Sequence, residues 1–219
     1  MKVLFIFVIN LFNILIKHTD KYLMIKQTIQ NLLGESAGNG IKKEEIEVVE
    51  LLLELQLPEP LKYMYQEIGN DALFMDSFCH FYPVYDLLVV DNKIQFLEEN
   101  QDVCRWAFDM KDTKVYQQAD DEWYLLENIS LEKFLSDILY YQCAIGYPFG
   151  AEVLLERNQL FTILDAEWEK VVAFDGLYIY WKKDSMIWYL SDDNSVGDVY
   201  YSSRNEDSFN SHKQQFCLK

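Results

Sequence analysis

The order of structural elements is clearest between Lys93 and Gly146, which read KIQFLEENQDVCRWAFDMKDTKVYQQADDEWYLLENISLEKFLSDILYYQCAIG. Val103–Asp109 alternates in polarity and places Cys104, Trp106 and Phe108 on one face, as expected for a β-strand.

A second strand is predicted at Thr113–Gln117, because the polar link Met110–Asp112 has the length of a hairpin turn. Gln118–Glu122 then gathers three carboxylates, and Trp123–Leu126 is apolar again. The pattern therefore indicates short aromatic strands that are joined by tight turns, with an acidic turn before the last one.

An amphipathic helix follows these strands. Ser130 is a suitable N-cap, Glu132 favours the positive end of the helix dipole, and Gly146 stands where a C-terminal stop is expected. The predicted buried stripe consists of Leu131, Phe134, Leu135, Ile138 and Leu139.

Helices are predicted on the N-terminal side of this stretch, at Met24–Leu33, at Lys42–Leu55, and from Pro60 to Ile68. On the C-terminal side, short strands are expected, with a strong hairpin signal at Asp175-Gly176 and a closing helix over Asn205–Cys217. The expected strands are Leu160–Leu164, Val171–Phe174, Leu177–Trp181, Met186–Leu190 and Val199–Ser202.

These elements predict an α+β fold, in which N-terminal helices precede a mostly antiparallel sheet with one crossing helix. We expect three parts: a poorly assigned N-terminal segment over residues 1–40, an α+β core over 41–147, and a strand-rich extension over 148–219. The extension is expected to end in a helix and to pack on the same sheet.

Met1–Ile16 is strongly apolar and admits three interpretations. It resembles the apolar part of a signal peptide, but Asn10 and Asn13 interrupt it and no small-residue cleavage site follows. It is shorter than the ~20 residues that a membrane helix needs. The third interpretation is that translation starts at Met24. We expect a cytoplasmic protein without a stable membrane partner, with export or anchoring through residues 1–23 as the alternative.

The charge balance limits the classes of partner. The chain of 219 residues has a formal net charge of −17, from 36 acidic and 19 basic residues. Such a surface repels nucleic acid, whose binding depends on Lys and Arg, and it attracts a basic protein or a cation. Solubility alone is the simpler explanation of the acidity.

The residues that could carry chemistry form no recognisable constellation. The four cysteines are far apart in the sequence and form no C-x-x-C motif, which favours reduced thiols over disulfides or a zinc site. They are Cys79, Cys104, Cys143 and Cys217. Phosphate-loop, dinucleotide and nucleophile-elbow motifs are missing, so we expect no cofactor, no metal and no enzymatic activity. Paired carboxylates, as in a glycosidase, are the weaker alternative, because acidic pairs are expected by chance in so acidic a chain.

Acidic residues are concentrated between Glu98 and Asp137, where 11 acids face 4 bases and the net charge is −7. Aromatic residues are interleaved with them, which is typical of a protein-binding surface. A solvated sheet edge that repels other copies of the chain is the alternative. The candidate partner-binding residues are Glu98, Glu99, Trp106, Asp120, Asp121, Glu122 and Trp123.

Four pieces of the chain, in this order, resemble the SUKH superfamily, the family of the fungal cell-wall synthesis regulator and its bacterial relatives. They read LQLPEPLKYMYQEIGN, FYPVYDLL, IQFLEENQDVCRWAFDM and NISLEKFLSDIL, and the likeness covers Ile41 to Ile145, about half of the chain. Each piece alone is weakly specific. The resemblance implies the fold of residues 41–147 and a role as the immunity protein of a polymorphic toxin system.

Such an immunity protein binds a toxin domain, commonly a nuclease or a deaminase, and blocks it by direct contact. An acidic chain suits a basic toxin of this kind. A general regulatory or scaffold adaptor of the same fold is the alternative, and a carboxylate-dependent hydrolase is the weakest one.

Overall fold

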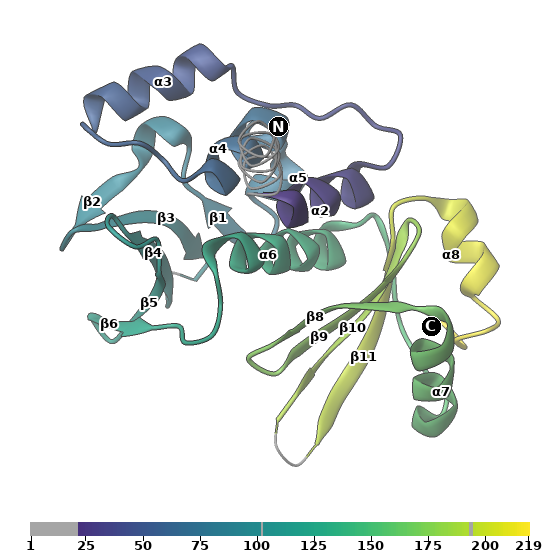
Figure 1. The fold of residues 1–219 in the computed structure, drawn as a ribbon. Helices are drawn as coiled ribbons and strands as arrows, with labels where there is room; N and C mark the ends of the chain where they lie inside the picture. The colour runs from purple at the N-terminus through teal and green to yellow at the C-terminus, as the bar shows by residue number, and fades with distance from the viewer. Residues whose placement is uncertain (1–21, 102, 193–194) are drawn as a thin grey trace, which may run out of the picture.

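The computed structural model describes residues 22–101, 103–192 and 195–219. Within them, N-terminal helices are followed by two antiparallel sheets, and the long helix α6 lies between the sheets (Figure 1). The predicted α+β class is therefore confirmed. The interpretations of Met1–Ile16 concern residues outside those described, and no described helix is long and apolar enough to cross a membrane.

The N-terminal helices begin and end close to the predicted residues. The helix α2 lies within the segment that the sequence left poorly assigned, and it packs on α6, where Glu132 accepts hydrogen bonds from the backbone N–H groups of Met24 (2.9 Å) and Ile25 (3.2 Å). The helices are α2 (Leu23–Leu33), α3 (Lys43–Leu52), α4 (Glu59–Ile68), α5 (Ala72–Met75), α6 (Leu131–Gly146), α7 (Arg157–Glu167) and α8 (Glu206–His212), with a 3-10 turn at Val84–Asp86.

The first sheet has the strand order β1-β3-β4-β5-β6, with β2 paired to β3. Its acidic turn joins β5 to β6 and contains Asp120 and Asp121 at φ of 50° and 63°, the left-handed geometry of a two-residue hairpin. The expected hairpins of this region are present. The strands are β1 (Cys79–Phe81), β2 (Leu88–Val90), β3 (Lys93–Glu99), β4 (Arg105–Asp109), β5 (Val115–Ala119) and β6 (Glu122–Leu125).

The C-terminal strands form a second sheet of their own, with the order β7-β11-β10-β9-β8. The predicted turn at Asp175-Gly176 is confirmed, and Gly176 is needed there because φ is +79° and an added Cβ would lie 2.6 Å from the carbonyl oxygen of Ser191. The strands are β7 (Phe149–Glu152), β8 (Glu169–Phe174), β9 (Leu177–Lys182), β10 (Ser185–Ser191) and β11 (Val196–Ser203).

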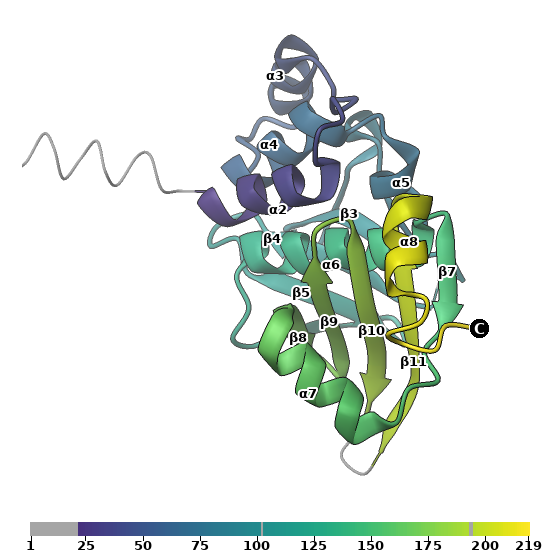
Figure 2. The ribbon, with the colours of Figure 1, turned by 90° about the vertical axis from the view of Figure 1, so that its right-hand side faces the viewer.

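Three expectations for residues 148–219 are wrong. These residues do not pack on the first sheet, because both faces of their own sheet are apolar: one faces α6 and the other is covered by α7 and α8 (Figure 2). Leu160–Leu164, predicted as a strand, belongs to α7. Leu160 and Leu164 are four residues apart and share one buried helical face, and Glu156 caps the helix through the N–H groups of Asn158 and Gln159. The closing helix is shorter than predicted.

The helix α6 carries the core that both sheets share. Ser130 caps it as predicted, with its hydroxyl 3.2 Å from the N–H of Lys133. The buried ring of Phe134 lies 6.0 Å from Phe96 and 6.1 Å from Trp106 in the first sheet, and 6.4 Å from Phe174 in the second. The side chain of Phe134 therefore connects α6 with both sheets.

We expect Phe134→Ala to lower the free energy of unfolding by about 3–5 kcal/mol, because the cavity would open between both sheets at once. Chemical denaturation followed by circular dichroism measures this change. Leu51→Ala on α3 is the matched control, since Leu51 is 77% exposed and its loss should change stability little. Equal effects of the two substitutions would contradict a shared core at Phe134.

Candidate functional site

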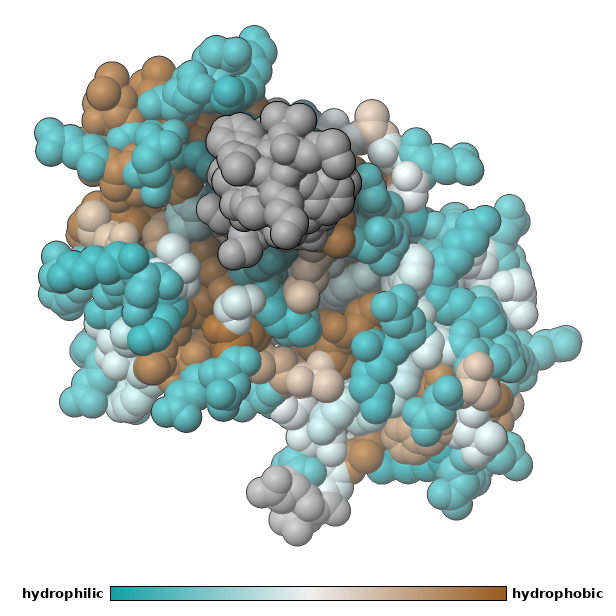
Figure 3. All heavy atoms as spheres, in the orientation of Figure 1, coloured by the Kyte–Doolittle hydropathy of each residue, from teal (hydrophilic) through white to brown (hydrophobic). Residues whose placement is uncertain are grey.

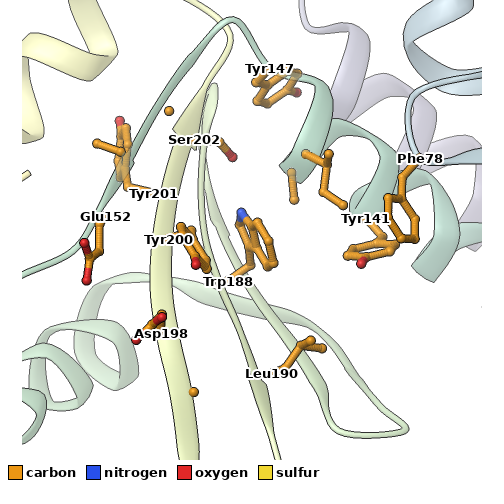
Figure 4. Close-up of a pocket in the computed structure, with 15 residues that line it drawn as sticks. Phe78, Tyr141, Tyr147, Glu152, Trp188, Leu190, Asp198, Tyr200, Tyr201 and Ser202 are labelled. Carbon is orange, nitrogen blue, oxygen red and sulfur yellow. The ribbon is translucent and has the colours of Figure 1, made fainter. Parts of the chain in front are cut away.

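A groove of about 730 Å³ runs between the C-terminal half of α6 and the face of the second sheet that α6 only partly covers (Figure 4). We call it the aromatic groove. It is lined by Phe78, Tyr141, Ala144, Ile145, Tyr147, Gly150, Ala151, Glu152, Trp188, Leu190, Gly197, Asp198, Tyr200, Tyr201 and Ser202.

Strand register places the main groove residues in one row. Trp188 of β10 pairs with Tyr200 of β11, and Tyr200 pairs with Glu152 of β7, so these three side chains share one face of the sheet. Trp188 and Tyr200 stack with their ring centroids 4.8 Å apart and their planes 28° apart. Asp198 lies two residues before Tyr200 on the same strand, and therefore on the same face.

The opposite wall comes from α6 and from the loop before β1. Tyr141 meets Trp188 edge-on at 6.2 Å, and Phe78 meets Tyr141 edge-on at 5.3 Å. Burial raises the pKa of Tyr141 to about 12, and the nearby Cys79 and Glu99 add to the shift. Tyr141 is therefore an uncharged phenol at neutral pH, and the groove presents a continuous wall of aromatic rings.

Gln142 holds the loop that carries Phe78. It is fully buried, and its amide oxygen accepts hydrogen bonds from the N–H groups of Phe78 (2.8 Å) and Cys79 (2.9 Å), while its amide nitrogen donates to the carbonyls of Phe74 (3.2 Å) and Cys79. One side chain thus satisfies four backbone groups and fixes the wall of the groove to α6.

The inner end of the groove holds a buried polar atom without a partner. The hydroxyl of Ser202 has no hydrogen bond within the described residues, although Ser202 is only 3% exposed. Ser202 pairs across the strands with Gly150, where an added Cβ would meet nothing closer than a backbone oxygen at 3.7 Å. A ligand group that enters this space would find an unused hydrogen-bond acceptor and donor.

The outer part of the groove is negatively charged. Glu152 and Asp198 are both exposed, and neither forms an ion pair within the part of the chain that the structure describes. No Lys, Arg or His is among the groove's lining residues. Arg157 binds the backbone carbonyls of Val196 (2.6 Å) and Gly197 (3.3 Å) instead of Asp198.

The predicted partner-binding residues lie mainly on the first sheet and form no single surface. Glu98 and Trp123 share a row on the face away from α6. The carboxylate of Glu98 accepts a hydrogen bond from the Tyr82 hydroxyl at 2.6 Å, and the ring of Trp123 lies 5.9 Å from the ammonium of Lys93. Trp106 points to the other face and packs on α6, so it serves the core.

The remaining predicted residues lie at two further places. Asp120 and Asp121 form the exposed β5–β6 turn, and the Glu122 carboxylate beside them accepts a hydrogen bond from Tyr124 at 3.2 Å. Glu99 pairs across the strands with Cys79, next to Phe78 in the wall of the aromatic groove.

A second exposed apolar surface lies on α3, where Figure 3 shows hydrophobic side chains gathered at the upper left. Val48, Leu51 and Leu52 are 50%, 77% and 74% exposed. They form one side of a surface helix, and none of the buried polar atoms without a partner among the described residues lies beside them.

Cys79 is a buried thiol whose pKa burial raises to about 12, so its nucleophilic thiolate form is scarce at neutral pH. The described residues contain no group of His, Cys, Asp and Glu that could hold a metal ion.

Comparisons of the chain with protein-family models, with curated proteins and with solved structures find no match. The SUKH resemblance therefore stays a prediction. Sequence reasoning missed the groove, although period-2 alternation already placed Trp188 with Leu190 and Tyr200 with Ser202 on common strand faces.

We expect Gln142→Leu to lower the free energy of unfolding by about 2 kcal/mol or more, because it leaves buried backbone groups without partners. It should also change the near-ultraviolet circular dichroism of the aromatic groove. Ser136→Ala, on the same helix, is the control, because the Ser136 hydroxyl is buried without a hydrogen bond. Hydrogen exchange at Phe78 and Cys79 that is unchanged in Gln142→Leu would contradict this role.

Proposed function

We propose that the protein is an immunity-type binding protein, which neutralises a basic toxin domain such as a nuclease or a deaminase by direct contact. The observation that carries this proposal is the aromatic groove: exposed rings next to Glu152 and Asp198, with no basic side chain in its lining. Aromatic side chains in a pocket are typical anchors of protein interfaces, and complementary charge speeds the association of a basic partner.

The charge of the whole chain supports the same partner class. A net charge of −17 favours a basic protein over nucleic acid. The SUKH resemblance is the reason to propose a toxin among the possible basic partners. The proposal includes a cytoplasmic location, because an immunity protein would meet a toxin that attacks nucleic acid there.

Two other functions compete with this one. A regulatory adaptor of the same fold would use the same groove for a resident protein of the cell. A carboxylate-dependent hydrolase is less well supported, because Glu152 and Asp198 are both exposed and stand on one face of one sheet, whereas a glycosidase places two carboxylates on opposite sides of the scissile bond.

Co-expression with the product of the neighbouring gene tests the proposal, with cell survival and co-purification as the measurements. We expect survival and a stoichiometric complex that weakens as salt is raised. Neutralisation by contact would be refuted if the cells survive without a complex. It would also be refuted if the cells die and no complex is found. A complex that forms without any toxicity to relieve would favour the adaptor.

The surface is tested in the same assay. We expect Tyr200→Ala to weaken the complex about tenfold or more, as for an aromatic anchor. Tyr85→Ala is the matched control, because Tyr85 is 55% exposed and lies on the 3-10 turn, where its hydroxyl bonds Glu45. If the triple change Asp120→Asn, Asp121→Asn and Trp123→Ala lowers the affinity of the complex more than Tyr200→Ala does, the interface lies on the first sheet.

A further inference from the structure

The aromatic groove has the features of a site for one kind of side chain. We propose that it recognises an arginine side chain presented by the partner, with the guanidinium between the ring of Tyr200 and the carboxylates of Glu152 and Asp198. This inference rests on the proposed function for the source of the arginine, but the site can be tested without the partner.

A cation fits the groove better than a neutral or anionic group. The faces of aromatic rings carry negative potential, and a cation over such a face gains about 0.5–1 kcal/mol at exposed sites. Tyr200 is 38% exposed while stacked on Trp188, so one face of this pair is open to a ligand. The register sets Glu152 directly beside Tyr200, and Asp198 follows two residues along the strand. Rings and carboxylates therefore attract positive charge to the same place.

Figure 4 shows this arrangement: Trp188 and Tyr200 stand side by side on the sheet, with Glu152 and Asp198 next to Tyr200 and with Tyr141 and Phe78 across the groove. The two carboxylates belong to neighbouring strands, β7 and β11. A side chain that enters the groove would thus meet rings on two sides and acids at the entrance.

A guanidinium suits the site better than an ammonium. It is planar and stacks on aromatic rings, and its N–H donors lie in a fixed fork that binds a carboxylate through two bonds at once. Glu152 lies two residues from Gly150, the cross-strand partner of Ser202, so the unused donors of a guanidinium on Glu152 face the inner end of the groove. There the Ser202 hydroxyl lacks a partner, and Gly150 leaves open space beside it. A lysine ammonium is a compact point charge and uses the flat walls less well.

Binding of three short peptides to the full chain tests this inference: acetyl-Gly-Arg-Gly-amide, its lysine analogue, and its citrulline analogue, which has nearly the shape of arginine without the charge. Calorimetry at low salt measures affinity, and tryptophan fluorescence reports contact with Trp188. We expect the arginine peptide to bind about tenfold more tightly than the citrulline peptide, and more tightly than the lysine peptide.

Two variants locate the site. Glu152→Gln with Asp198→Asn should abolish the preference for arginine over citrulline. Glu127→Gln with Asp165→Asn is the matched control, because it removes the same charge at two exposed residues outside the groove and should keep the preference. Ser202→Ala should weaken arginine binding severalfold without loss of stability, since the hydroxyl has no partner to lose.

The inference is wrong if the arginine peptide does not bind, if it binds no better than citrulline, or if the control variant loses as much as the groove variant. A toxin complex that still depends on Tyr200 under these outcomes would leave the proposed function intact. Arginine binding that follows the expected pattern, without any toxin complex, would instead refute the proposed function and keep the site.

Discussion

The helix α6 is buried on two sides at once, against both sheets. Its residues contact the first sheet through Phe134 and Gln142 and the second sheet through Phe134 and Tyr141, while α2 covers it further along. A helix that is apolar around most of its circumference has to lie inside a protein. Neither sheet is joined to the other by strand pairing, so α6 is the element that makes one core of both.

The aromatic groove is a consequence of that arrangement. The strands β10 and β11 run past the helix, so α6 covers Met186 but leaves Leu190 54% exposed and Tyr200 38% exposed (Figures 1 and 4). The other face of the same sheet is closed by α7, α8 and Phe216. Exposed aromatic surface of this kind favours association, and the nearby carboxylates restrict which partner can use it.

Some acidic side chains bond to other parts of the fold, whereas others have no ion-pair partner among the described residues, and the net charge alone does not distinguish them. Within the acidic stretch from Glu98 to Asp137, Glu98 and Glu122 of the first sheet accept hydrogen bonds from tyrosines, and Glu132 of α6 caps the helix α2. These acids support the fold. In the groove, Glu152 and Asp198 have no ion-pair partner among the described residues and lie next to open aromatic faces. Fewer acids are present there, and their carboxylates are exposed.

Features that depend on local interactions can be predicted from the amino-acid sequence. The hairpin at Asp175-Gly176 and the cap at Ser130 depend on residues close together in the chain and were predictable. The same holds for the buried stripe of α6, except that Ile138 is only partly buried. Locality also explains the failure at Leu160–Leu164: in so short a window an apolar run fits a strand or a helix, and the burial of α7 against the second sheet decided the outcome.

Two further features depend on packing between distant parts of the chain: the last strands form a second sheet, and Tyr141 lies opposite Trp188, 47 residues later in the sequence. Period-2 alternation assigns a side chain to a face, but it does not say what covers that face. The groove exists because the second sheet extends beyond α6. How far a sheet extends past a helix is a property of the packed chain.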